Sequence, residues 1–385
     1  MLAASLVLVA MLAGGAPAQQ PADAAAIRTA ISQLSSFDFA TRTDAARVVR
    51  RAPAAIAVPA LREAVTRTDR DEYVRFKAFV LLSQIDPAVT AQIAQQVLPD
   101  RNDRVRTVAY QWFEHHPDPA VVPALVRALA TEQSEFVRPA LTRALAAAGT
   151  DAPVRDALAP LVMRGQDMFR GAVIEALGDY DGRYALADIT AVAQLDGPLQ
   201  DDAITALGRL GDASSRAVLA KLQDSARREL QPTISAALCL QGVDCDARLA
   251  YLKSTLEYAG ANPSYQPLLR GVVHALAVLA ASGREPALTM LFDAGVSSKD
   301  PARAAITLGV GYVALRKADV VLKVLATRAD SQPAIALVGD AFDMLSSEDF
   351  EEERFGAEVR RALASAPAGA PERRVAEALI KELGY

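Results

Sequence analysis

The chain has 385 residues, of which 51% are hydrophobic and 23% charged, and its formal net charge is −5. This high apolar content with a small net charge excludes an intrinsically disordered chain, and two cysteines are too few for a scaffold held mainly by disulfides. Only 5% of the residues are aromatic while alanine is abundant, which favours closely packed helices over sheets because alanine is the best helix former and a poor strand former.

The first 18 residues are predicted to be a secretory signal peptide. They carry no charged side chain, and an apolar run over residues 2–12 leads to the small-residue cleavage pattern Ala16-Pro17-Ala18. No Lys or Arg precedes the run, so an uncleaved anchor or a misplaced start codon stays open as an alternative. No later segment has the apolar length of a membrane span. We therefore expect an exported protein, periplasmic or extracellular, with no membrane span in the mature chain.

From residue 37 to residue 345 the sequence repeats with a period of 31 or 32 residues. Four arginines stand at the same place in successive units, each after an apolar residue and three or four residues after an acidic one. The four pairs are Asp71 and Arg75, Asp103 and Arg106, Glu135 and Arg138, and Asp167 and Arg170. A second acidic series falls in the middle of each unit, at Asp86, Asp118, Asp151, Asp181 and Asp212. Two markers that share one period indicate a repeat architecture.

Each unit is predicted to be a helix, a short turn and a second helix, as in residues 204–222. Ile204, Leu207 and Leu210 share one helical face, and Gly211 stands where a helix-terminating glycine is expected. Asp212 offers a side-chain oxygen to the first N–H groups of the next helix. The alternation of such helix pairs predicts a solenoid with small residues between closely stacked helices.

These stretches resemble HEAT repeats, most of all the short phycobilisome-lyase type. The matching segments are DEYVRFKAFVLLSQIDPAV, DRVRTVAYQWFEHHPDPAVVPALVRAL and ITALGRLGDASSRAVLAKL. The resemblance implies an all-α, armadillo-like, right-handed α-solenoid of about ten stacked antiparallel helix pairs. It covers residues 37–345 and is looser after residue 230, with a capping helix over residues 19–36 and capping helices over residues 346–385. We expect one elongated array and a monomer.

The eight acidic and arginine residues of the repeat are interpreted as a structural ladder. In this interpretation each acidic residue caps its helix, and each arginine pairs with an acid nearby or in the adjacent unit. The resemblance implies the same, because this arginine is a framework residue of the repeat. Contact with a ligand is the alternative.

Cys239 and Cys245 lie on either side of a predicted helix end at Gly242. An exported protein meets oxidising conditions, so the pair is a candidate structural disulfide between two helices. Two buried thiols, or a redox or chromophore-attachment site, are the alternatives, although the spacing is not that of a C-x-x-C redox motif.

The sequence motifs predict no catalytic residue, metal site or cofactor. His115 and His116 lie in FEHHPDP, which we interpret as a solvated turn, with weak binding of a divalent metal as the alternative. His274 lies in an apolar helix and is interpreted as an interior residue. Gly309 and Gly311 fit G-x-G-x-x-A, but they fall in register with a first helix of a repeat, where a dinucleotide site would need a preceding strand.

Two clusters of charge stand near the two ends of the repeat region. Arg42, Arg47, Arg50 and Arg51 form a basic cluster, and residues 348–353 form an acidic run. We interpret both as solvated helical faces. The sequence pI of about 5.4 and the predicted export argue against a nucleic-acid partner, which would need a broad basic surface.

The function that follows is a non-enzymatic scaffold of the cell envelope that binds another protein or a peptide on its concave face. We expect the second helices of the pairs to build that face. The exposed residues expected there are Arg62, Gln92, Gln96, Arg127, Arg155 and Arg183. A bilin-lyase-like or chaperone activity, which the resemblance implies for some relatives, and a purely structural accessory module are the alternatives.

Overall fold

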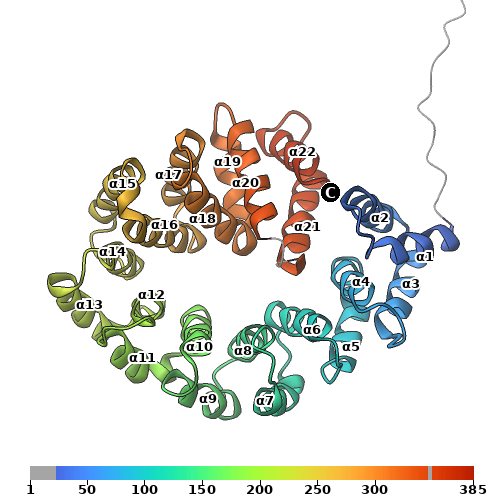
Figure 1. The fold of residues 1–385 in the computed structure, drawn as a ribbon, viewed down its shortest axis with the longest axis horizontal. Coiled ribbons are helices and arrows are strands. Elements are labelled where there is room, and N and C mark those ends of the chain that lie inside the picture. Colours follow the sequence, from blue (N-terminus) through green and yellow to red (C-terminus); the bar gives the residue numbers. More distant parts are fainter. Residues whose placement is uncertain (1–22, 346–348) are drawn as a thin grey trace, which may run out of the picture.

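A computed structural model describes residues 23–345 and 349–385, and within these ranges every regular element is a helix (Figure 1). The helices form two layers that follow a closed curve. The inner layer contains α4 (Glu72–Ile85), α6 (Asp103–His115), α8 (Arg138–Ala147), α10 (Asp167–Asp179), α12 (Gln200–Leu210), α14 (Gln231–Leu240), α16 (Gln266–Ala281), α18 (Ala302–Arg316), α20 (Gln332–Met344) and α21 (Asp349–Ser365). The all-α solenoid of stacked helix pairs is confirmed.

The outer layer alternates with the inner one along the chain. It contains α3 (Ala54–Thr66), α5 (Pro87–Gln96), α7 (Val122–Thr131), α9 (Ala152–Leu158), α11 (Leu186–Ala193), α13 (Ala213–Ser225), α15 (Cys245–Ala261), α17 (Glu285–Ser297), α19 (Ala318–Thr327) and α22 (Pro371–Leu383). Helices α1 (Ala24–Gln33) and α2 (Phe39–Arg51) begin the array, and short 3-10 turns are present at Pro119–Val121, Ala159–Val162, Arg183–Ala185 and Pro263–Tyr265. The predicted signal peptide, residues 1–18, lies outside the described residues.

Several of the helix ends and caps predicted from the sequence are present at the turns. Gly211 ends α12 in the left-handed region with φ 64°, and the side chain of Asp212 accepts a hydrogen bond from the backbone N–H of Ser214 at 2.8 Å. Asp86 and Asp118 accept backbone hydrogen bonds at the start of α5 and of the turn before α7 in the same way. Asp151 and Asp181 make no such bond, so the second acidic series caps only part of the units.

Close approach of the inner helices explains which layer faces inward. A Cβ atom added to Gly178 of α10 would lie 2.8 Å from the Cα of Ala206 in α12. One added to Gly208 of α12 would lie 2.6 Å from the Cα of Ala237 in α14. Because small residues let the first helices of these units stack more closely, the array curves around the first helices. Our expectation that the second helices form the concave face is wrong.

The glycines of the G-x-G-x-x-A pattern lie inside α18, and no strand precedes them in the described part of the chain. A Cβ on Gly309 would lie 2.5 Å from Val273 Cγ1 of α16, and one on Gly311 would lie 2.5 Å from Leu345 Cδ1. These glycines therefore serve close helix packing, as predicted. None of the described helices is both long and apolar enough to cross a membrane.

The array does not stay open and elongated as we expected, because its last units meet its first (Figure 1). Helix α21 packs against α4, and the chain's C-terminal end lies beside α2. Phe350 of α21 is 2% exposed and packs with the buried side chains of the first half of the chain. The solenoid is therefore closed into a ring.

Candidate binding site in the centre of the ring

A central cavity of about 1610 Å³ lies among the inner helices. Its wall includes the C-terminal ends of α6, α10, α12 and α18, which contribute Glu114, Asp179, Arg209 and Arg316. Helix α21, near the C-terminal end of the chain, forms another part of the cavity wall. Residues from both halves of the chain thus face one space, which no single repeat could form.

A network of ion pairs follows the cavity wall from α6 to α12. Arg143 of α8 donates from Nε to Glu114 Oε1 at 2.7 Å and from Nη1 to Asp179 Oδ2 at 2.8 Å. Arg209 Nη1 lies 2.6 Å from Asp179 Oδ1, and the Tyr180 hydroxyl donates to Glu114 Oε1 at 2.6 Å. Burial works against the charged form of Arg143, but the carboxylates of Glu114 and Asp179 outweigh it and raise its pKa well above the ordinary value.

Two contacts cross the ring between α10, α12 and α18. Arg209 Nη2 donates to the Tyr312 hydroxyl at 2.6 Å, and Arg316 Nη2 donates to Glu175 Oε1 at 2.8 Å. Burial opposes ionisation of Glu175, but Arg316, Arg143 and Arg209 together hold its pKa below the usual range. Glu175 is therefore a fixed negative charge that ties opposite walls together.

The ring is closed at a joint, which we define as the contacts of α21 and α22 with α2, α4 and α6. Arg50 of α2 makes a bidentate pair with Glu353, and Lys77 of α4 pairs with Asp349. The side chains of Arg50 and Glu353 are only 16% and 5% exposed. Our interpretation of the basic cluster and the acidic run as solvated faces is therefore wrong for these residues, because the two clusters meet across the joint.

His115 lies at the same joint and is not in a solvated turn. Its Nε2 is 2.7 Å from Glu351 Oε1, and its ring stacks on Phe350 with 6.0 Å between centroids. Burial opposes the charged form of Glu351, but the hydrogen bond from His115 and the charges of His115 and Arg354 lower its pKa to about 2. Our solvated-turn interpretation is wrong for His115, since α21 covers it.

A family model described as HEAT repeats matches residues 90–178, from within α5 to within α10. This stretch of the chain is thus similar to HEAT repeats. The stacked pairs before and after it continue the same two layers. A search of curated proteins finds no match for the chain.

Three of the solved structures that this chain matches are given with their TM-scores. YibA from Escherichia coli has a TM-score of 0.42 at 18% identity, covering 56% of this chain and 81% of that one. Human deoxyhypusine hydroxylase in complex with glycerol has a TM-score of 0.29 at 22% identity, covering 56% of this chain and 84% of that one. Kap95p, which binds RanGDP, has a TM-score of 0.43 at 12% identity, covering 94% of this chain and 66% of that one.

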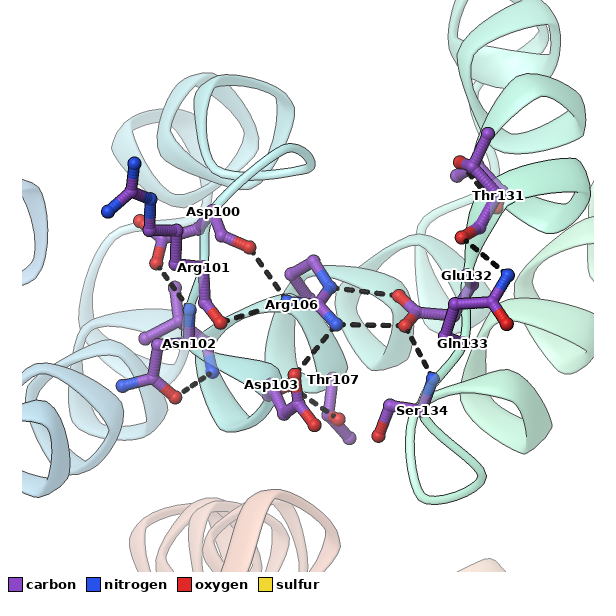
Figure 2. A network of polar contacts seen from close by, with 12 residues as sticks. Asp100, Arg101, Asn102, Asp103, Arg106, Thr107, Thr131, Glu132, Gln133 and Ser134 are labelled. Atoms are coloured by element: carbon purple, nitrogen blue, oxygen red, sulfur yellow. Dashed lines mark hydrogen bonds and ion pairs between the residues drawn. The ribbon is translucent and has the colours of Figure 1, made fainter.

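The arginine series of the repeat forms the predicted ion pairs in the first two units. Arg75 is 3% exposed; it donates to the Val65 carbonyl at 2.9 Å and pairs with Asp100, which stands just before the next repeat. Figure 2 shows the equivalent Arg106, whose guanidinium contacts both carboxylate oxygens of Glu132 at 2.8 and 2.9 Å. Arg75 and Arg106 thus each bridge their own repeat to the acid that precedes the next one.

The acidic members of the series have different local roles. Asp71 caps α4 by accepting hydrogen bonds from the backbone of Tyr73 and Val74 at 3.0 Å. Asp103 stands inside the first turn of α6 and accepts from Arg106 at 2.7 Å, as Figure 2 shows. Asn102, which the sequence analysis missed, is the residue that caps α6.

The ladder changes in the third unit. Arg138 lies over the ring of Phe169, with the guanidinium carbon 3.9 Å from the ring centroid, and Glu135 makes no ion pair within the described residues. In the fourth unit Arg170 donates to Asp167 Oδ1 of its own unit and to the Val162 carbonyl, each at 2.9 Å, but it makes no ion pair with an acid before the next repeat within the described residues. In the third unit the ring of Phe169 thus takes the place of the carboxylate that pairs with the arginine in other units.

The residues expected on the concave face all lie in the outer layer. They are Arg62 on α3, Gln92 and Gln96 on α5, Arg127 on α7, Arg155 on α9, and Arg183 in the turn before α11. None of these six lines the central cavity. The sequence signal that could have identified the inner layer is the presence of small residues in the first helices, such as Gly178 and Gly208.

The structure brings Glu114, His115 and Glu351 together, with one potential ligand atom of each within 4.8 Å of the others. His116 is not part of this group, because it stacks on Trp112 with 3.6 Å between ring centroids. The guanidinium groups of Arg143 and Arg354 already bind the two carboxylates at 2.7 Å. Two adjacent positive charges make this group a poor cation site.

Cys239 and Cys245 are joined by a disulfide, with 4.3 Å between their Cα atoms. The bond links the end of α14 to the start of α15. His274 of α16 lies 6.1 Å from the Tyr312 ring, and burial lowers the pKa of its imidazole. It is an interior residue, as predicted.

Proposed function

We propose that this protein is a non-enzymatic scaffold that binds a segment of another protein in the central cavity. The observation that supports this function best is the cavity itself, whose wall combines charged and apolar residues from both halves of the chain. Its volume of about 1610 Å³ exceeds the range of about 300–1,000 Å³ that is usual for small-molecule pockets. A chain segment with several side chains suits a space of this size.

The state of two acids, Glu351 on the cavity wall and Glu175 behind it, supports binding rather than catalysis. Ion pairs and hydrogen bonds keep Glu175 and Glu351 ionised, with pKa values below their usual range. A general acid or base works best with a pKa near the working pH. Both groups are instead suited to holding the wall in one shape.

We further propose that the protein is exported to the cell envelope and acts as a monomer. Export is supported by the uncharged apolar run and small-residue pattern at the N-terminus. The monomer is supported by the joint, because the first and last units cover one another and do not offer open ends for another copy. A bilin-lyase-like activity stays an expectation from the type of repeat.

Site-specific photo-crosslinking in cell-envelope extracts tests this function. A crosslinking amino acid in place of Phe136, which lines the cavity with its side chain 87% exposed, is expected to capture the partner. The same amino acid in place of Arg127, on the outer helix α7, is the matched control. Capture of the same protein from the outer position alone would contradict a binding site inside the ring.

A further inference from the structure

The charges on the wall of the central cavity do not cancel. Seven arginines and lysines line it, against five aspartates and glutamates. The whole chain has a formal net charge of −5, so the cavity wall has the opposite sign to the molecule as a whole. A positive wall inside an acidic protein selects for an anionic ligand.

Each of the five acids on the wall is already in an ion pair. Glu114 pairs with Arg143, Asp179 with Arg143 and Arg209, Glu351 with Arg354, Asp103 with Arg106, and Asp349 with Lys77. Their charges are thus balanced by the protein itself. None of them adds an unbalanced negative charge to the space that a ligand would enter.

Three of the cations on the wall have no ion pair within the described residues. Arg104, Arg284 and Lys317 line the cavity with exposed side chains. The Arg104 guanidinium lies over the rings of Tyr73 and Phe76, at 5.4 and 5.5 Å from their centroids, which leaves its N–H groups available. Arg284 and Lys317 follow the C-terminal ends of the neighbouring helices α16 and α18.

The cavity wall also exposes apolar side chains to solvent. Phe136 is 87% exposed and Leu308 of α18 is 42% exposed, and both line the cavity. A ligand that fits these features has negative charges and apolar side chains together. A nucleic acid suits the site less well, since the five acids of the wall interrupt any continuous phosphate-binding surface.

We infer that the central cavity binds an acidic segment of a partner protein, whose Asp or Glu side chains pair with Arg104, Arg284 and Lys317. Apolar side chains of the same segment contact Phe136 and Leu308. This inference rests on the proposed function, because it names the class of segment that the same cavity takes. The partner is recognised by a sequence that alternates acidic and apolar residues.

The test uses the full chain and three fluorescein-labelled peptides of equal length, which alternate leucine with glutamate, glutamine or lysine. Fluorescence anisotropy is expected to show the glutamate peptide binding about tenfold or more tightly than the glutamine peptide, with the difference lost at high salt. Equal or tighter binding of the glutamine or lysine peptide would overturn the acidic preference. So would tighter binding of a single-stranded oligonucleotide of similar length.

Charge-matched variants place the binding in the ring. The double variant Arg284→Ser and Lys317→Ser is expected to weaken binding of the glutamate peptide about tenfold. Arg62→Ser with Arg127→Ser removes the same charge from the outer layer and is expected to leave the affinity unchanged. Equal loss in both double variants would show general charge attraction and overturn the inference.

The outcomes separate this inference from the proposed function. Binding of a neutral peptide that weakens in Phe136→Ala would keep the cavity as the binding site and reject only the acidic class. Failure of all three peptides to bind would reject the acidic class as well, and the crosslinking comparison of the Phe136 and Arg127 positions would then decide the proposed function by itself.

Discussion

Arg50 and Glu353 are 303 residues apart in the sequence, yet their side chains form a bidentate ion pair. The Nε of Arg50 donates to Glu353 Oε1 at 2.8 Å and its Nη2 donates to Oε2 at 2.5 Å. A second arginine, Arg360, lies 3.1 Å from the same carboxylate. This pair joins the first helices of the solenoid to the last and, together with the other contacts of the joint, closes the array into a ring.

Replacing Arg50 with alanine is expected to open the ring. The change leaves the buried Glu353 carboxylate with one partner fewer, and removing one partner of a buried pair costs about 3–5 kcal/mol. Small-angle X-ray scattering is expected to show a larger radius of gyration while the helical circular dichroism signal stays unchanged. Arg51→Ala, on the same helix but exposed, is the control. An unchanged radius of gyration in Arg50→Ala would show that the pair does not close the ring.

Raising the pH is expected to weaken the joint through Glu352. Burial and the nearby carboxylate of Asp349 raise the pKa of Glu352 to about 7, although Lys77 and Arg50 oppose the shift. An unfolded glutamate has a pKa of about 4.3, so the folded state binds more protons between these two values. The stability contributed by this group is therefore lost as the pH rises from about 4.3 to about 7.

The Glu352→Gln variant has no titrating group at this position. The melting temperature of the variant minus that of the natural protein should therefore increase from about pH 5 to about pH 8. The comparison is made between the two proteins because Asp202, whose pKa burial raises to about 6, titrates in the same range in both. A constant difference in melting temperature across the range would exclude Glu352 as the titrating group.

Two arginines at the same place in the repeat are expected to differ in their importance. Arg75→Ala removes the guanidinium that neutralises the largely buried Asp100 carboxylate and donates to the Val65 carbonyl, and it should destabilise the fold by about 3–5 kcal/mol. Arg138→Ala removes a contact with the Phe169 ring and should cost only about 1 kcal/mol. Denaturant unfolding of both variants measures the difference, and equal losses would mean that the ion pair adds nothing over the ring contact.

The disulfide is expected to stabilise the protein locally. Closing a short loop contributes about 2 kcal/mol on the chain-entropy model, so Cys239→Ser with Cys245→Ser should lower the free energy of unfolding by about this amount. Alkylation followed by mass spectrometry should label neither cysteine until a reductant is added. Labelling of both thiols in unreduced protein from an oxidising compartment would contradict the bond.

The sequence by itself determined the repeating unit, because the signals involved are local. Gly211 and Asp212 end one helix and begin the next through contacts within a few residues. Arg75 reaches an acid that lies just before the next unit, so the same periodic pattern that reveals the repeat also indicates this ion pair. Short-range chemistry of this kind recurs in several repeats and can be recognised within a single one.

Only the tertiary structure decided which layer faces inward and that the ring closes. The direction of curvature depends on how closely successive helices approach, as at Gly178 and Ala206, and small rotations add up over many units. The basic cluster around Arg50 and the acidic run around Glu353 were both visible, but each suits a solvated helix face when considered alone. Their pairing depends on the summed curvature of all the repeats between them, which no local pattern records.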